Sequence, residues 1–153
     1  MTEQHPSPET KELRQRAVRL LARREHTRAE LTRKLAPHGT TEEIETVLNE
    51  LATQGLQSDA RFAESYLRSQ AARLGTTRLR HTLRTKGVES ALIDAHLSGA
   101  GLPDEAARAR AVWERKFTAA PVDAREWAKQ ARFLQGRGFA TDTIRRLLKS
   151  MEE

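Results

Sequence analysis

A run of positive charge occupies the middle of the sequence. Residues 73–88 (RLGTTRLRHTLRTKGV) contain five Arg or Lys side chains, one His and no carboxylate. The stretch without an acidic residue is longer still, because none lies between Glu64 and Glu89. Arginine presents a planar fork that can donate two parallel hydrogen bonds to a phosphate or a carboxylate. This stretch therefore indicates either the binding of an anion or, as the alternative, a solvated helix face.

Rows of like charge recur on the helices that the sequence predicts. Arg80 and Arg84 stand four residues apart beside the apolar Leu79 and Leu83. A second row lies on the predicted helix 123–135, where Arg125, Lys129 and Arg132 are spaced at i, i+4 and i+7. Opposite charges at i,i+4 gain a few tenths of a kcal/mol on a solvated face, and like charges cost a similar amount. These rows therefore favour an anionic partner.

The charge of the 153-residue chain is unevenly distributed. It has 27 basic and 21 acidic side chains, and a net charge of +6. Residues 1–59 hold nine basic and ten acidic side chains, whereas residues 60–101 carry a net charge of +4 and residues 102–153 a net charge of +3. The positive surplus thus follows the first third of the chain. Such a balance suits an acidic partner without identifying nucleic acid.

Several function classes have no support in the sequence. The absence of cysteine excludes disulfides, thiol catalysis and thiolate metal sites. The five histidines lack metal-ligand spacing, and no phosphate-cradling glycine loop or catalytic triad can be assembled. We therefore expect no enzyme, cofactor or metal. The polar start MTEQHPSPET and the lack of an apolar run of about 20 residues predict a cytoplasmic protein without a membrane contact.

The pattern Leu-x-x-x-Gly recurs three times, at residues 35–39, 83–87 and 134–138. Helical periodicity flanks each copy, and no alternating strand pattern is present. The predicted helices are 11–24, 27–36, 41–53, 59–72, 76–86, 89–97, 104–118, 123–135 and 141–150. We expect an all-α fold of three tandem three-helix repeats, 11–58, 59–101 and 102–153, stacked into an elongated array after a flexible polar tail at 1–10.

Local signals mark the ends of these helices. Thr27 with Glu30, and Thr40 with Glu43, have the spacing of a capping box. Further N-caps are predicted at Asp59, Asp104 and Asp123. Left-handed glycines that end a helix are predicted at Gly39, Gly87 and Gly138.

The aromatic residues have two interpretations. Phe62 and Tyr66 share a helix face, and this spacing favours packing in a core, with stacking on bases as the alternative. Trp113, Phe117 and Trp127 are assigned to the core in the same way. Phe133 lies off the face marked by Trp127, so we expect it to contact a neighbouring helix or a partner.

The three repeats resemble the RecX family, bacterial proteins that modulate the RecA recombinase. The similarity extends over residues 14–150 and rests on three motifs, at 24–39, 56–88 and 132–144. The first motif comprises Arg24, His26, Thr27, Glu30, Leu31, Lys34, Leu35 and Gly39. In the third motif, Gln135 and Gly136 depart from the commoner Ala-Arg type of pair, which removes one positive charge.

The resemblance implies three three-helix units that bind the RecA filament on single-stranded DNA. Such binding would hinder filament growth, ATP hydrolysis, strand exchange and the coprotease activity of the SOS response. It also implies binding of single-stranded and double-stranded DNA, and we expect a monomer. The residues predicted to contact acidic filament surface or DNA phosphates are Arg73, Arg78, Arg80, Arg84, Lys86, Arg125, Lys129, Arg132 and Arg137.

Two alternatives remain open at this stage. The first is a DNA-binding protein that contacts phosphates through its Arg and Lys rows without needing the recombinase. Its basic residues are spread over several helices, which differs from a single recognition helix. The second is a scaffold that docks an acidic protein and never contacts DNA.

Overall fold

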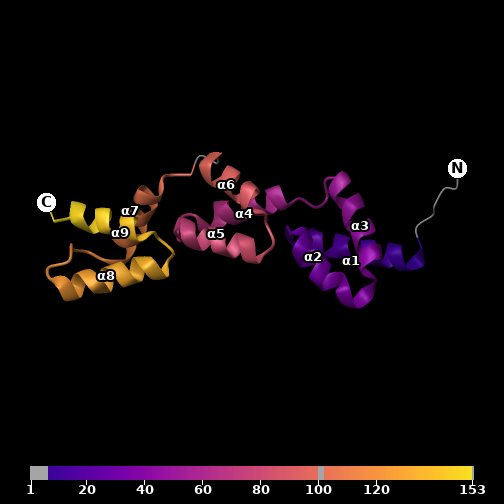
Figure 1. Ribbon diagram of the computed structural model, residues 1–153, viewed down its shortest axis with the longest axis horizontal. Coiled ribbons are helices and arrows are strands. Elements are labelled where there is room, and N and C mark those ends of the chain that lie inside the picture. The colour runs from indigo at the N-terminus through magenta and orange to yellow at the C-terminus, as the bar shows by residue number, and fades with distance from the viewer. Residues whose placement is uncertain (1–6, 100–101, 153) are drawn as a thin grey trace. The chain divides into compact units, whose positions relative to one another are not determined.

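The computed structural model describes residues 7–99 and 102–152, and all regular structure within these residues is helical (Figure 1). The α-helices are α1 (Pro8–Arg23), α2 (Arg28–Leu35), α3 (Thr41–Thr53), α4 (Asp59–Gln70), α5 (Thr76–Thr85), α6 (Ser90–Gly99), α7 (Glu105–Lys116), α8 (Ala124–Gly136) and α9 (Thr141–Ser150). A short 3-10 helix, η1 (Ala36–His38), follows α2. The predicted all-α class and the order of the helices are confirmed. The elongated stacking and the repeat boundaries stay predictions.

The chain forms two compact units. The N-terminal unit comprises Met1–Ser65 and Lys86–Glu89, and the C-terminal unit comprises Tyr66–Thr85 and Ser90–Glu153. None of the helices in the described residues is long and apolar enough to cross a membrane. Each unit has its own buried apolar residues.

The core of the N-terminal unit is built from one face each of α1, α2 and α3. Its fully buried side chains are Leu13, Ala17, Leu31, Leu35, Ile44, Val47, Leu48 and Leu51. Residues spaced three and four apart on a helix share one face, which explains why these positions meet. Gly39 has an extended backbone with φ −169°, so its predicted left-handed conformation is wrong. A Cβ at Gly39 would lie 2.6 Å from Leu13 Cδ1, so the small residue is needed for close packing.

The helix starts follow from side chains that accept hydrogen bonds from free amides. Both predicted capping boxes are present, at Thr27 and at Thr40. Ser7 caps α1 and Pro8 occupies its first turn, so the helix begins three residues before the predicted start at residue 11. Asp104 and Asp123 cap α7 and α8, as predicted.

The prediction that Asp59 is the N-cap of its own helix is wrong. Ser58 takes that place, because its Oγ accepts from the Arg61 amide at 3.1 Å. Asp59 is the first residue of α4, and its Oδ1 accepts from the Arg28 amide at 2.8 Å. The carboxylate therefore caps the start of α2, which lies 31 residues earlier in the chain.

The C-terminal unit buries apolar side chains from its five complete helices. Leu79, Leu83 and Ile93 are fully buried. A second set, from α7, α8, α9 and the turn between the last two, contains Ala109, Val112, Trp113, Leu134, Phe139, Ile144, Leu147 and Leu148. Gly138 has a φ of 90° and confirms the left-handed prediction. Gly87, in the N-terminal unit, does the same with a φ of 95°.

Candidate anion-binding site

Four basic side chains of the C-terminal unit line one pocket of about 220 Å³. They belong to the turn after α4, to the end of α7 and to the residue that ends α8. They are Arg73, Arg115, Lys116 and Arg137. Val112 and Phe133 complete the described lining, which contains no carboxylate. A concave, acid-free group of cations is suited to an anion.

Phe133 supplies an aromatic wall to this pocket. Its half-buried ring meets Phe117 edge to face, with the ring centroids 5.4 Å apart. Lys116 Nζ lies 5.7 Å from the Phe133 centroid, and Arg137 Cζ lies 5.3 Å from it. Both distances are within the range of cation–π attraction. The prediction that Phe133 contacts a neighbouring helix is confirmed by its packing on Phe117, the C-cap of α7.

Two glycines bring Arg73 and Arg137 to the same pocket. The Gly75 amide donates to the Arg137 carbonyl at 2.8 Å. A Cβ on Gly75 would lie 2.4 Å from the Gly138 carbonyl, so the two backbones meet where no side chain fits. The positive φ of Gly138 turns the chain at this point, a conformation that glycine adopts without strain.

Glu105, in the first turn of α7, holds the starts of two other helices. Its Oε1 accepts from the Thr76 amide at 3.1 Å and from the Ala140 amide at 3.4 Å. Its Oε2 accepts from Thr143 Oγ1 at 2.8 Å. A negative charge is favourable at helix N-termini, where amides lack partners. Glu105 therefore ties α5 and α9 to α7 and fixes the frame around the pocket.

Arg108, one turn later, is a buried arginine with a structural position. It is 7% exposed, and its guanidinium donates to the carbonyl groups of Ala71, Leu74 and Pro103 and to Thr76 Oγ1. Burial lowers the pKa of Arg108, while the nearby carboxylates of Glu105 and Asp104 raise it. An arginine remains charged under these conditions. Arg108 thus holds the 71–74 turn, which carries Arg73.

The structure brings together only two of the predicted binding residues, Arg73 and Arg137, in this pocket. Arg80 forms an ion pair with Asp94, and Arg78 donates to the Gly136 carbonyl at 3.3 Å. The predicted residues that lie exposed outside the pocket are Arg78, Arg84, Arg125, Lys129 and Arg132. Sequence reasoning missed Arg115 and Lys116, although the basic pair directly before Phe117 could have drawn attention to them.

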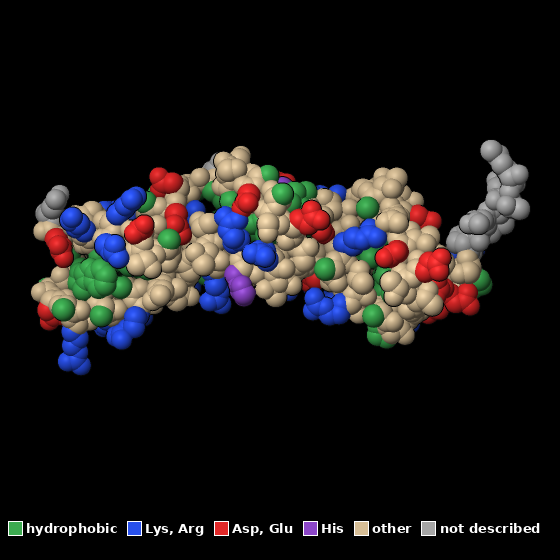
Figure 2. All heavy atoms as spheres, viewed as in Figure 1, with side chains coloured by type: hydrophobic (Ala, Val, Ile, Leu, Met, Phe, Trp, Pro, Cys, Tyr) green, Lys and Arg blue, Asp and Glu red, His purple; other side chains and the backbone are tan. Residues whose placement is uncertain are grey.

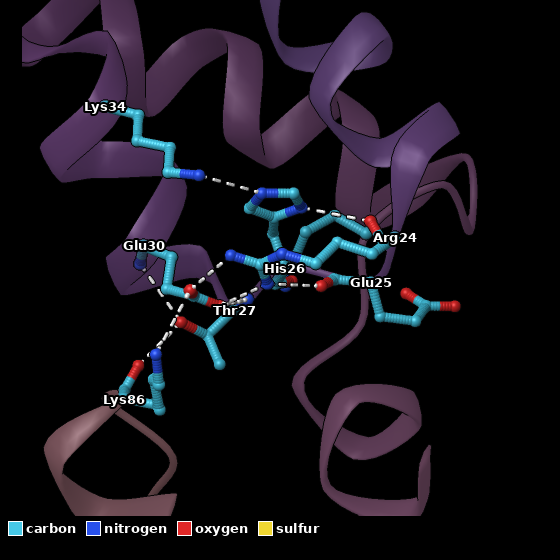
Figure 3. Close-up of polar contacts among 8 residues, drawn as sticks. Arg24, Glu25, His26, Thr27, Glu30, Lys34 and Lys86 are labelled. Atoms are coloured by element: carbon cyan, nitrogen blue, oxygen red, sulfur yellow. Dashed lines mark hydrogen bonds and ion pairs between the residues drawn. The ribbon is translucent and has the colours of Figure 1, made fainter. Parts of the chain in front are cut away.

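The first motif forms a buried polar cluster in the N-terminal unit (Figure 3). His26 is 2% exposed, with Nδ1 3.0 Å from the Arg24 carbonyl and Nε2 3.2 Å from Lys34 Nζ. A lysine ammonium only donates, so Nε2 is the acceptor and Nδ1 carries the proton. Burial lowers the pKa of His26, and the charges of Arg24 and Lys34 act in the same direction. His26 is therefore a neutral side chain that orients Lys34.

Glu30 is the acceptor at the centre of this cluster. Arg24 Nη2 lies 3.0 Å from Oε2, and the Thr27 amide donates to Oε1 at 3.1 Å. Burial alone would raise the pKa of Glu30, but the hydrogen bonds from Arg24 and Thr27 and the charge of Lys86 hold it below its ordinary value. Lys86 Nζ is 3.8 Å from Oε2, and the Lys86 carbonyl accepts from Thr27 Oγ1 at 2.6 Å. Lys86 is thus engaged inside the N-terminal unit.

Metal ligands are not grouped in the described part of the chain. No cluster of three or more His, Asp or Glu side chains there could hold an ion. The grouped side chains of the Phe133 pocket are instead arginine and lysine, which suit contacts with anions.

Family models match all three repeats. The first, second and third three-helix domains of RecX match residues 14–51, 58–97 and 103–148. A protein named regulatory protein RecX from Leptothrix cholodnii is 46% identical over 138 residues, covering 90% of this chain and 87% of that protein. Its namesake from Chromobacterium violaceum is 46% identical over 141 residues, covering 92% and 91%.

Two solved structures share the fold. A crystal structure titled regulatory protein RecX aligns with a TM-score of 0.78 and 22% identity, covering 92% of this chain and 73% of that one. A crystal structure of RecX from Lactobacillus salivarius aligns with a TM-score of 0.78 and 21% identity, covering 94% and 97%. At these identities the likeness concerns the fold alone.

Proposed function

The chain belongs to the RecX family, and we propose that it is a regulatory protein that binds the RecA filament on single-stranded DNA. In this proposal, binding inhibits filament growth, ATP hydrolysis, strand exchange and coprotease activity. The relatives are named regulatory proteins, which supports a role without catalysis. Inhibition requires only that the protein bind a blocked filament state better than the growing one.

The pocket around Phe133 is the observation that carries the proposal. A filament on single-stranded DNA presents phosphates and acidic side chains, and four clustered cations fit both. The wider charge of the C-terminal unit acts in the same sense, because its sequence holds sixteen basic and nine acidic side chains. The surplus would draw a polyanion toward this unit at low ionic strength. Figure 2 shows Lys and Arg side chains projecting from the part formed by α7 to α9.

Co-sedimentation with preformed filaments tests this proposal. Filaments of the cognate recombinase on poly(dT), fixed with a non-hydrolysable ATP analogue, should pellet the wild-type protein. Exchanging both Arg73 and Arg137 for Glu should reduce the pelleted fraction several-fold, because two of the four pocket charges are reversed. The exposed Arg146→Glu on α9 is a control outside the pocket. Equal pelleting of the wild-type and pocket variants would contradict the proposal.

A filament-independent DNA-binding protein is the second candidate, and Phe133 favours it. An aromatic ring flanked by cations can stack on an unpaired base while the cations contact its phosphates. The two candidates differ in what happens without recombinase. Tight binding to bare oligo(dT), with recombinase inhibition only when the DNA is saturated, would support the second candidate over the first.

A further inference from the structure

The N-terminal unit has a basic pocket of its own, of about 350 Å³. Its basic lining comes from α1, from the end of α2 and from η1, and consists of Arg16, Arg19, Arg23, Lys34 and His38. Leu20 and Leu35 give the pocket an apolar part. No carboxylate and no aromatic ring other than His38 belongs to the described lining. None of these residues belongs to the proposed DNA contacts.

Two features show that the pocket is organised before any ligand binds. Arg16, Arg19 and Arg23 follow one another at i, i+3 and i+7, which places them on one stripe of α1. Lys34 Nζ donates a hydrogen bond to Nε2 of the buried His26 at 3.2 Å, which fixes the position of the ammonium group (Figure 3). The cations therefore face a common space, and ligand binding need not first gather them.

Arg16 is the basic lining residue whose contacts with the rest of the N-terminal unit are incomplete. Its Nη2 lies 3.2 Å from Glu12 Oε1, an ion pair of the exposed i,i+4 type. Its Nε is buried and has no hydrogen-bond partner among the described residues. A buried donor without an acceptor is unfavourable.

The chemistry around the pocket favours a protein carboxylate over a DNA phosphate. The sequence of the N-terminal unit holds eleven basic and twelve acidic side chains, so it carries no general attraction for a polyanion. Acidic side chains gather near the start of α1 on the face that Figure 2 shows. These acidic side chains would repel a continuous chain of phosphates that passed them. A short acidic segment of a protein would fit within the pocket and would not extend to them. The partly exposed Leu20 offers contact to an aliphatic side chain, and the pocket has no counterpart of Phe133 for a base.

We propose that this pocket binds an acidic segment of a partner protein, in which carboxylates flank an aliphatic side chain. The carboxylates pair with Arg19, Arg23 and Lys34, and the aliphatic group lies on the partly exposed Leu20. Arginine binds carboxylates through two parallel hydrogen bonds, which gives the pocket a preference for Glu and Asp. The inference goes beyond the proposed function, and it does not depend on the DNA contacts of the C-terminal unit.

A labelled peptide tests the proposal on the full-length protein. The probe is fluorescein-GEELEEG, followed by fluorescence anisotropy in 50 mM NaCl. Exchanging both Arg19 and Arg23 for Glu should weaken binding at least tenfold. The double variant Lys11→Glu and Arg33→Glu is the matched control. These exposed residues lie on α1 and α2, which also supply the pocket lining, but they lie outside the pocket. The control should stay within twofold of the wild type.

Further arms separate the proposal from its rivals. GQQLQQG should not bind, and GEEGEEG should bind more weakly than the probe because it lacks the leucine. Circular dichroism should give equal helicity for every variant. The milder exchange of Arg19 and Arg23 for Gln should reduce the affinity for the probe less than the exchange for Glu does. Equal losses in the pocket and control variants, or no binding of the probe by the wild type, would overturn the proposal.

The same variants, titrated with fluorescein-labelled dT15, test the choice of a peptide over DNA. Exchanging Arg19 and Arg23 should change the dT15 affinity less than twofold. A loss for dT15 larger than that for the peptide would overturn the proposal in favour of a phosphate site. Failure of the proposed filament function would appear in variants of Arg73 and Arg137, so the two results are separable.

Discussion

The double substitution Arg73→Gln and Arg137→Gln tests whether the Phe133 pocket contacts phosphates of single-stranded DNA. Each phosphate neutralised on a single strand contributes about −0.7 to the slope of log affinity against log salt. With four phosphate contacts, the pocket cations would contribute about −2.8, and the double variant would keep about −1.4. Between 50 and 200 mM salt, the pocket alone would lower affinity about 50-fold in the wild type and about sevenfold in the variant.

The assay is fluorescence anisotropy of labelled dT15 at three salt concentrations. A variant with Arg110→Gln and Arg146→Gln removes the same charge from exposed positions outside the pocket. Its slope should stay close to that of the wild type. The reasoning is refuted if the pocket variant keeps the wild-type slope, or if the control changes by the same amount.

Three further predictions concern Phe133, Arg108 and the buried polar cluster. Phe133→Leu should reduce dT15 affinity by about 1–3 kcal/mol through lost stacking, with the salt slope unchanged; an unaltered affinity would exclude stacking. Arg108→Met should destabilise the C-terminal unit by about 2 kcal/mol, because it removes hydrogen bonds to three carbonyl groups. Urea denaturation measures this, and an unchanged midpoint would contradict it. As pH falls below 6.5, the ordinary pKa of His26, the unfolded chain binds a proton before the folded one, so the free energy of unfolding should fall. Glu30 should add a further loss below about pH 4.5, its ordinary pKa, and His26→Gln should remove the upper step alone.

The sequence predicted those features of the fold that depend on nearby residues. Capping boxes at Thr27 and Thr40 act within one turn, so their spacing alone identifies them. Asp59 acts on a helix 31 residues away, and such a contact leaves no local pattern. Gly39 shares the Leu-x-x-x-Gly pattern of Gly87 and Gly138, but close packing on Leu13 explains its small size instead.

The candidate sites were less visible than the helices. Arg115 and Lys116 join Arg73 because Glu105 and Arg108 fix α7 against the helix starts and the 71–74 turn, and because Arg115 itself donates to the Ala72 carbonyl at 3.1 Å. These contacts join residues 29 to 43 positions apart, which periodicity does not reveal. The pocket of the N-terminal unit was hidden for a different reason. Counting charge over residues 1–59 gave a near balance, although α1 places three arginines on one stripe.

The filament proposal is tested most directly by the single-stranded-DNA-dependent ATPase of the cognate recombinase. The full-length protein is titrated from far below one molecule per DNA site up to saturation of the DNA. We predict inhibition at the low ratio, where the protein could not cover the DNA and must act on the filament. Inhibition that begins only when the DNA is saturated, or none at any ratio, would contradict the proposal.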